Sequence, residues 1–514
     1  MKQTLDLGIL LALVTLIYLP ISAQTLNSYE EYLQARQQLM RQDSQLYFDY
    51  AISLSDKEQK LNQQLLSLQK QMLQTYKDQH FFPPARNFYQ SKEHIEKTKL
   101  FEFIKELPKG GILHLHSGAM GDVDWMIQKA KSLPEMYVYW DSKSSSATPK
   151  GTFHAYKKGA IPEGYLQVKA LLKAQPSAYQ ELRSLLVFEE EMDRDSVDIW
   201  GEFQLVFTRI NDFLNYRPAY EDYIVHGMEI LIADNIQHCE MRTAFLDRLY
   251  DLDNPKGSLG IESFAAIYEN IERRIKVIDP EFSFHIIHCS LRFKDGPAIW
   301  KEMEDVFSSR KKYPHLVRGF DLVAEEDAGH STLFHANQFL RLDSLEAAHN
   351  VHLPLYLHDG ESNWASVDNL YDAVLLGSKR IGHGYNLYRF PQLLELVKEK
   401  DICLEISPLS NQILGYIRDL RNHPASTYLR RGINCTISSD DPLIFDYHGL
   451  SYDYWSIFLA WELDLAALKK LSYNGIYYSS LTLEEKGNAL RIWDRQWDAF
   501  VDEMLTSGLL KKSN

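Results

Sequence analysis

Histidine and acidic residues recur at the ends of short apolar segments, and these side-chain types bind metal ions. His114 and His116 end the segment 110–117. Because alternate residues of a strand point to the same side, both histidines can face one ion. His358 and Asp440, at the ends of two further segments, would complete a shell of three histidines and one carboxylate. Such nitrogen and oxygen ligands suit zinc, with a water in the remaining position.

Each of these motifs has a simpler structural explanation when it is taken alone. A His-x-His pair is more often buried and hydrogen-bonded than bound to a metal. Asp440-Asp441-Pro442 is more often a turn or a helix cap, and His383, between two glycines, could be a structural residue. The combination is more specific, because separate segment ends all carry the required side chains beside Gly or Pro.

Eight apolar, β-rich segments supply these positions, and helical patterns lie between most of them. The segments are 110–117, 235–244, 282–292, 317–326, 352–361, 380–386, 402–411 and 434–442. Strands that alternate with helices in this way predict a (β/α)8 TIM barrel of the α/β class rather than an open doubly wound sheet. No GxGxxG motif follows the first segment, as a dinucleotide-binding fold would require. Barrel enzymes place their active sites at the carboxyl ends of the strands, where the polar residues lie.

The N-terminus has the pattern of a signal peptide at residues 1–23. Lys2 precedes an apolar stretch at 7–19, and the small residues Ser22 and Ala23 follow. This predicts export, to the extracellular space or to a bacterial periplasm. No other segment approaches ~18 uninterrupted apolar residues, so we expect no membrane association after cleavage.

Two further regions accompany a barrel assigned to residues 109–514. Residues 24–108 form a predicted helical extension, because apolar side chains recur there at helical spacing. That extension could be a dimerisation surface or helices packed on their own chain. The wide gap between the first two strand segments predicts an insertion at about 127–195.

The composition excludes several classes of protein. The chain has 70 Asp and Glu against 55 Lys and Arg, a formal net charge of −15, which argues against a nucleic-acid partner or an anionic membrane. The cysteines are widely separated and form no CxxC motif, so we expect buried free thiols; they are Cys239, Cys289, Cys403 and Cys435.

Taken together, the motifs resemble the metal-dependent adenosine deaminases, and more closely their secreted branch, the adenosine deaminase-related growth factors. The general resemblance rests on HLH (114–116), HDGES (358–362), RIGHG (380–384) and SSDDP (438–442). The closer one rests on WGEF (200–203), GFDLV (319–323), EISPLSNQIL (405–414), DLRNHP (419–424) and GLSYD (449–453). The resemblance implies one zinc ion per subunit, bound by His114, His116, His358 and Asp440. It also implies a homodimer formed through the N-terminal helices.

The resemblance also implies roles in converting adenosine, and 2′-deoxyadenosine, to the inosine product and ammonia. Glu361 would donate a proton to the purine ring, and His383 would orient or deprotonate the metal-bound water. Asp441 would hydrogen-bond the other purine ring. The residues implied in substrate binding are Asp441, Trp200, Phe203, Phe207, Ala324 and Ser117.

Four positions depart from the family pattern, mostly around the sugar. Ser117 replaces an acid that contacts the ribose, and Leu291 replaces a histidine. Ala324 replaces a glycine, and Asp359 stands where a small residue is usual. A site that loses polar partners discriminates less sharply for the hydroxyl they held. A 5′-modified or phosphorylated adenine nucleoside is therefore an alternative substrate.

Two other functions remain open from the sequence. The protein could be an extracellular binding or growth-factor-like protein that needs no catalysis, or another metal-dependent amidohydrolase acting on a cyclic amide or aryl amine. Intact Glu361 and the complete set of metal ligands argue against a binding protein without catalysis. Asp441-Pro442 and the Trp200 segment favour a purine deaminase over another metal-dependent amidohydrolase.

Overall fold

The computed structural model describes residues 28–189, 198–244, 249–257 and 261–510. The chain divides into two compact units, residues 1–46 and 47–514. In the first unit, helix α1 (Tyr29–Ser44) begins at Ser28, whose side chain accepts a hydrogen bond from the Glu31 N–H. The predicted signal peptide, residues 1–23, lies outside the described residues.

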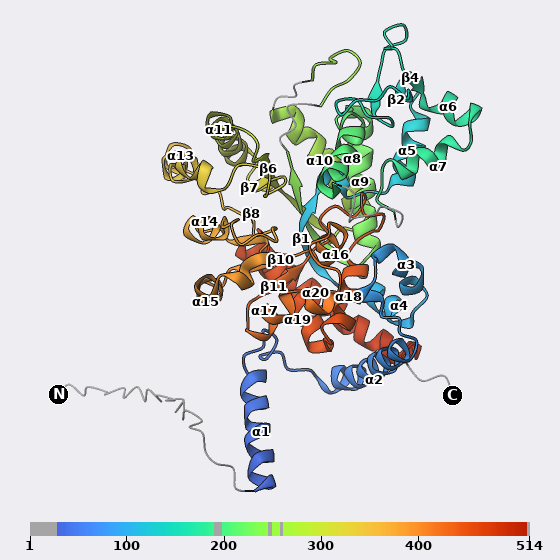
Figure 1. Ribbon diagram of the computed structural model, residues 1–514. Coiled ribbons are helices and arrows are strands. Elements are labelled where there is room, and N and C mark those ends of the chain that lie inside the picture. The colour runs from blue at the N-terminus through green and yellow to red at the C-terminus, as the bar shows by residue number, and fades with distance from the viewer. Residues whose placement is uncertain (1–27, 190–197, 245–248, 258–260, 511–514) are drawn as a thin grey trace, which may run out of the picture. The chain divides into compact units, whose positions relative to one another are not determined.

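Eight parallel strands form a closed barrel in the second unit, at the centre of Figure 1. One four-stranded sheet contains, in spatial order, β1 (Gly110–His116), β5 (Ile236–Thr243), β6 (Ser283–Leu291) and β7 (Val317–Val323). The other contains β8 (His358–Asp359), β9 (Arg380–His383), β10 (Cys403–Ile406) and β11 (Cys435–Ile437). Bridges between Leu115 and Asp440 and between Phe320 and Leu355 join the two sheets. The predicted (β/α)8 barrel is confirmed, and each predicted segment contains one of its strands.

Helices surround the barrel (Figure 1); most of them lie between successive strands in the sequence, and α18, α19 and α20 follow the last strand. Their bounds are α8 (Ile199–Leu214), α9 (Arg217–Ala233), α10 (Ile261–Ile278), α11 (Gly296–Lys312), α12 (Ala336–Phe339), α13 (Leu342–His349), α14 (Leu370–Leu375), α15 (Pro391–Glu399), α16 (Pro408–Ile413), α17 (Ala425–Arg430), α18 (Ser451–Ala460), α19 (Leu465–Tyr477) and α20 (Leu483–Ser507). Short 3-10 turns occur at Pro83–Ala85, Ser117–Ala119, Leu333–His335, Tyr385–Arg389 and Leu420–Asn422. Among the described residues, every helix is too short or too polar to span a membrane.

Between β1 and β5 in the sequence, the chain forms a small antiparallel sheet, seen at the upper right of Figure 1. Its central strand β2 (Met136–Tyr139) pairs with β3 (Phe153–Ala155) and β4 (Tyr165–Gln167). Helices α5 (Val123–Ser132), α6 (Val168–Ala174) and α7 (Ala178–Ser184) accompany it. These elements occupy the stretch where an insertion is expected; its limits, about 127–195, stay a prediction.

Three helices precede the barrel in the second unit: α2 (Asp56–Asp78), α3 (Phe88–Glu96) and α4 (Lys99–Glu106). Helix α2 begins with a capping box formed by Ser55 and Glu58. The Glu58 carboxylate also accepts a hydrogen bond from Trp497 Nε1 at 2.7 Å, and Leu61 and Leu65 are fully buried. The helical spacing of apolar side chains in this region is thus explained in part by packing on the same chain, whereas dimerisation stays a prediction.

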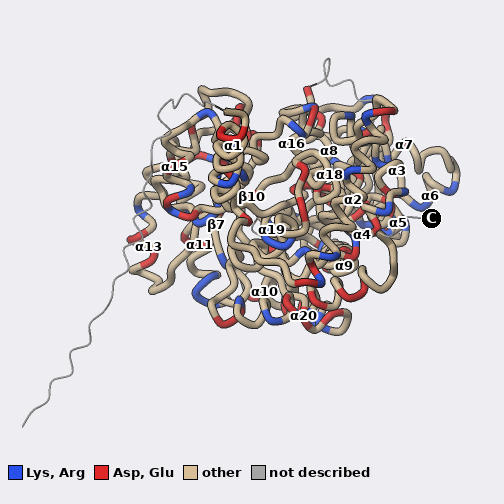
Figure 2. Tube along the Cα trace, turned by 90° about the horizontal axis from the view of Figure 1, so that it is seen from below, with Lys and Arg blue, Asp and Glu red and all other residues tan. Residues whose placement is uncertain are grey.

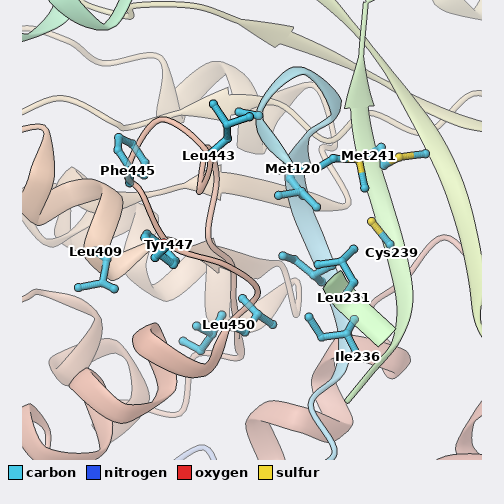
Figure 3. Close-up of a cluster of buried hydrophobic side chains, with 14 of the residues drawn as sticks. Met120, Leu231, Ile236, Cys239, Met241, Leu409, Leu443, Phe445, Tyr447 and Leu450 are labelled. Atoms are coloured by element: carbon cyan, nitrogen blue, oxygen red, sulfur yellow. The ribbon is translucent and has the colours of Figure 1, made fainter. Parts of the chain in front are cut away.

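Apolar side chains fill the space between the barrel strands and the surrounding segments. Figure 3 shows one cluster in which side chains from β5, α9 and the turn after β1 lie opposite others from α16 and from the loop after β11; the labelled residues are Met120, Leu231, Ile236, Cys239, Met241, Leu409, Leu443, Phe445, Tyr447 and Leu450. All the cysteines are buried and free, as expected. Figure 2 shows Lys and Arg interspersed with Asp and Glu along the described chain.

The backbone of β1 lies directly against helix α19, and two glycines make this possible. A Cβ atom at Gly111 would lie 2.4 Å from the Gly475 carbonyl oxygen, and one at Gly475 would lie 2.5 Å from the Gly111 carbonyl oxygen. Backbone cannot move aside as a flexible side chain can. This contact therefore fixes the position of the strand that carries His114 and His116.

We predict that Gly475→Ala destabilises the protein, because the added methyl group meets backbone. Overpacking of this kind costs about 1–3 kcal/mol. The matched control is Gly487→Ala in α20, where no atom lies within 4 Å of the new Cβ and the higher helix propensity of alanine stabilises by up to about 1 kcal/mol. Melting temperatures should fall for the first variant and rise for the second. Equal shifts in both would contradict the close packing of β1 on α19.

Candidate active site

Four side chains converge at the carboxyl ends of three barrel strands. His114 and His116 lie on β1, His358 begins β8, and Asp440 follows β11. Their ligand atoms all lie within 4.8 Å of one another. Asp440 Oδ1 is 3.3 Å from His114 Nε2 and 3.2 Å from His116 Nε2, and the Nε2 atoms of His116 and His358 are 3.3 Å apart. The structure therefore brings together the four residues that the sequence predicts as metal ligands.

The chemistry of this cluster fits a zinc ion. Ligand atoms about 2.0–2.1 Å from a tetrahedral zinc are separated by about 3.3 Å. His114 Nε2 and Asp440 Oδ1 are buried without a hydrogen-bond partner, which costs about 1–3 kcal/mol per group unless a ligand occupies the site. Burial lowers the pKa of His358 to about 3, so its imidazole is neutral, as metal binding requires.

Buried carboxylates orient two of the histidines. His358 Nδ1 donates to Asp321 Oδ2 at 2.6 Å, and His114 Nδ1 donates to Glu405 Oε2 at 2.9 Å. These hydrogen bonds leave both Nε2 atoms facing the cluster. Arg242 donates to both carboxylates, at 2.9 Å to Asp321 and 2.6 Å to Glu405. The sequence motifs do not single out Asp321, Glu405 or Arg242 as site residues; the signal that could have found them is a charged side chain inside an otherwise apolar strand segment.

Glu361 and His383 lie beside the cluster of four. His383 Nε2 is 3.5 Å from Glu361 Oε2, and both residues have ligand-type atoms within 4.8 Å of Asp440. Burial raises the pKa of Glu361 well above its usual value, and the carboxylates of Asp440, Glu326 and Asp441 raise it further. Glu361 can therefore carry a proton near neutral pH. Burial lowers the pKa of His383, so its imidazole is neutral.

The predicted substrate residues occupy different surroundings. Asp441 is buried beside Asp440. Trp200 Nε1 donates to the Tyr416 hydroxyl oxygen at 2.9 Å, joining α8 to the loop after α16. Phe203 stacks on Phe445 and contacts Phe207 edge-on, so it belongs to the packing of α8.

Phe207, Ser117 and Ala324 complete the predicted set. A Cβ atom at Gly118 would lie 3.6 Å from the Phe207 ring, which places this ring beside the turn that Ser117 begins after β1. Ala324 follows β7 at φ +88°, a conformation that favours glycine and costs an L-residue about 1–2 kcal/mol. Leu291, at the end of β6, is 41% exposed.

Tyr416 is a further residue near the site that no sequence motif indicates. Burial raises the pKa of its hydroxyl, and the Glu361 carboxylate raises it further. Its carbonyl oxygen accepts hydrogen bonds from Asn363 Nδ2 at 3.2 Å and from the Tyr385 hydroxyl at 3.1 Å. Nothing in its sequence neighbourhood marks Tyr416 as a site residue, because its partners come from distant segments.

A (β/α)8 barrel that gathers histidines and carboxylates at the carboxyl ends of its strands has the architecture of a metal-dependent hydrolase. Comparison with known proteins gives the family. The family profile described as Adenosine deaminase matches residues 178–494, and the one described as Adenosine/AMP deaminase N-terminal matches residues 11–104. The chain belongs to the adenosine deaminase family and is a hydrolytic deaminase.

Curated relatives and solved structures agree with this assignment. Adenosine deaminase 2 of Dictyostelium discoideum is 32% identical over 95% of this chain and 90% of its own length. Adenosine deaminase 2 of Homo sapiens is 30% identical over 94% of this chain and 95% of its own length.

Two solved structures share the fold at low identity. Arabidopsis ADAL complexed with IMP has a TM-score of 0.55, with 16% identity, and covers 78% of this chain and 99% of its own. An amidohydrolase from Burkholderia ambifaria with bound zinc has a TM-score of 0.52, with 17% identity, and covers 79% and 94%.

Proposed function

We propose that this protein is a zinc-dependent deaminase of adenosine, which it hydrolyses with water to inosine and ammonia, and that 2′-deoxyadenosine is a further substrate. The observation that carries the proposal is the convergence of His114, His116, His358 and Asp440 beside Glu361. The names of the curated relatives support adenosine as the substrate. The zinc bound in the Burkholderia amidohydrolase and the IMP bound to Arabidopsis ADAL support the metal and a purine ligand.

One zinc ion per subunit would be held by Nε2 of His114, His116 and His358 and by Asp440 Oδ1. When bound, it would supply a Lewis acid that lowers the pKa of a coordinated water. The hydrogen bonds from His114 to Glu405 and from His358 to Asp321 hold the two rings in the orientation this requires.

The remaining polar residues would handle protons and orient the purine. Glu361, protonated because its pKa is raised, would donate to the ring nitrogen beside the carbon that bears the amino group. His383, neutral and within 3.5 Å of Glu361, would orient or deprotonate the attacking water. Asp441 would hydrogen-bond the other ring of the purine. The carbon–nitrogen bond would then break, and the amino group would leave as ammonia after taking up a proton from the attacking water.

The substrate pocket would be lined by Trp200, Phe207, Ala324 and Ser117 around the nucleoside, with Phe203 packed behind Phe207. The uncharged side chains of Ser117 and Leu291 favour a second candidate, a 5′-modified adenine nucleoside or nucleotide. Without an acid at residue 117, a negatively charged 5′-group would meet less repulsion there.

We also propose that the protein is exported and forms a homodimer. The signal-peptide pattern of residues 1–23 supports export. Helix α1 supports the dimer, because none of its residues is buried although it carries exposed Tyr29, Tyr32 and Met40.

Glu361→Gln should abolish most turnover while it leaves zinc bound, because glutamine cannot donate a carboxylic proton. We expect kcat to fall roughly 100-fold or more, with one zinc per subunit retained. The ultraviolet change from adenosine to inosine gives the rate, and elemental mass spectrometry gives the metal content. A variant with the wild-type rate would exclude Glu361 as the proton donor.

A panel of substrates separates the two candidate substrate classes. We expect adenosine and 2′-deoxyadenosine to be turned over with higher kcat/KM than methylthioadenosine and AMP. Each compound is assayed by ammonia release at equal enzyme concentration. A higher kcat/KM for AMP or methylthioadenosine would instead establish the 5′-modified class.

Removal of residues 24–46 should convert the dimer to a monomer, since α1 carries the exposed apolar residues. The solution mass, measured by light scattering after chromatography, should fall by about half, with zinc content unchanged. The control is the substitution Glu30→Gln, Glu31→Gln, which leaves the apolar side chains in place. A truncated protein that stays dimeric would exclude α1 as the interface.

A further inference from the structure

A buried carboxylate lies directly behind the backbone that carries Glu361. Glu326, three residues beyond β7, is 6% exposed. Its Oε1 accepts the Gly360 N–H at 2.9 Å, and its Oε2 accepts the Glu361 N–H at 2.6 Å. One carboxylate thus binds the N–H groups of two successive residues, on both sides of the Gly360 Cα atom.

This pair of hydrogen bonds matters because it restrains the backbone of Gly360. Gly360 adopts φ +84°, and glycine has the widest conformational freedom of any residue. Rotation about the Gly360 backbone would swing Glu361 relative to His358, which lies two residues before Gly360. A misplacement of about 1 Å at a reacting group can cost roughly 100-fold in rate. Glu361 therefore needs a restraint outside its own segment.

Glu326 is itself held by a circuit of hydrogen bonds. Asn369 Nδ2 donates to Glu326 Oε1 at 2.7 Å, while Asn369 Oδ1 accepts the Thr332 N–H at 2.9 Å. Thr332 Oγ1 then donates to Asp359 Oδ1 at 2.6 Å. Asp359 precedes Gly360, so the circuit returns to the same turn. It joins the loop after β7, the start of α14 and the end of β8.

Arg292 ties this circuit to the barrel. Its Nη2 donates to the His358 carbonyl oxygen at 2.6 Å and to that of Leu322 at 3.3 Å, and its Nε donates to that of Ala324 at 3.2 Å. The guanidinium also lies 3.7 Å from Asp359. The ends of β6, β7 and β8 are thereby linked through one buried cation.

We propose that Glu326 is a positioning residue for Glu361: by binding the N–H groups of Gly360 and Glu361, it holds the Glu361 carboxyl where proton donation requires it. This inference rests on the proposed role of Glu361. Glu326 touches neither the substrate nor the reacting atoms, so its effect on the rate passes through Glu361. A carboxylate that served only to satisfy buried N–H groups would instead affect folding.

The first test is Glu326→Gln, which keeps the volume but leaves one acceptor oxygen for two N–H groups. We expect kcat for adenosine to fall roughly 10- to 100-fold, with KM within about threefold and one zinc per subunit retained. The matched control is Glu325→Gln, the same change one residue earlier, at a half-buried side chain; its kcat should stay within about twofold of wild type. Asn369→Ala removes the hydrogen bond that holds the Glu326 carboxylate and should also lower kcat. This variant tests the proposal if Glu326→Gln does not fold.

The second test is a double-mutant cycle with Glu361→Gln. If Glu326 acts through Glu361, adding Glu326→Gln to Glu361→Gln should change the residual rate by less than about threefold, because residues that act as a unit are not additive. Equal losses in both backgrounds, a loss of zinc, or a wild-type kcat in Glu326→Gln would overturn the positioning role alone. A wild-type rate in Glu361→Gln would overturn the proposed function, and this inference with it.

Discussion

A chain of alternating buried charges crosses the interior of the barrel, and the site depends on it. Arg242 pairs with Asp321 and Glu405, and Arg380 pairs with Glu405 at 2.5 Å and with Glu240 at 2.5 Å. All five side chains are essentially inaccessible to solvent. Because an uncompensated buried charge costs several kcal/mol, each member requires its neighbours in place. Two of these carboxylates also accept the Nδ1 protons that orient His114 and His358.

The site lies where the first and last strands of the barrel meet. β1 and β11 meet at the bridge between Leu115 and Asp440, so ligands from the first and last strands become neighbours. The close approach of Gly111 and Gly475 fixes β1 from the outside, while Arg242 fixes it from within through a hydrogen bond to the Leu113 carbonyl oxygen. His383 and Asp440 adopt φ +64°, and such uncommon backbone is held only where the surroundings determine it.

The fold and the ligand set could be predicted from local patterns, and the supporting residues could not. His114, His116, His358 and Asp440 each end an apolar segment, so strand period and strand end together indicate where they point. The partners of Arg242 lie 79 and 163 residues away; only the closed barrel brings them together. Glu326 stands beside Glu325 in the sequence, and nothing local shows which of the two is buried.

We propose that one zinc ion per subunit binds where His114, His116, His358 and Asp440 converge. The most direct measurement is X-ray diffraction from crystals of the purified protein, with data collected on both sides of the zinc absorption edge. We expect one anomalous peak per subunit, about 2.0–2.1 Å from Nε2 of each histidine and from an oxygen of Asp440. A peak bound by other residues, or a protein that deaminates adenosine with no metal peak at this position, would contradict the claim.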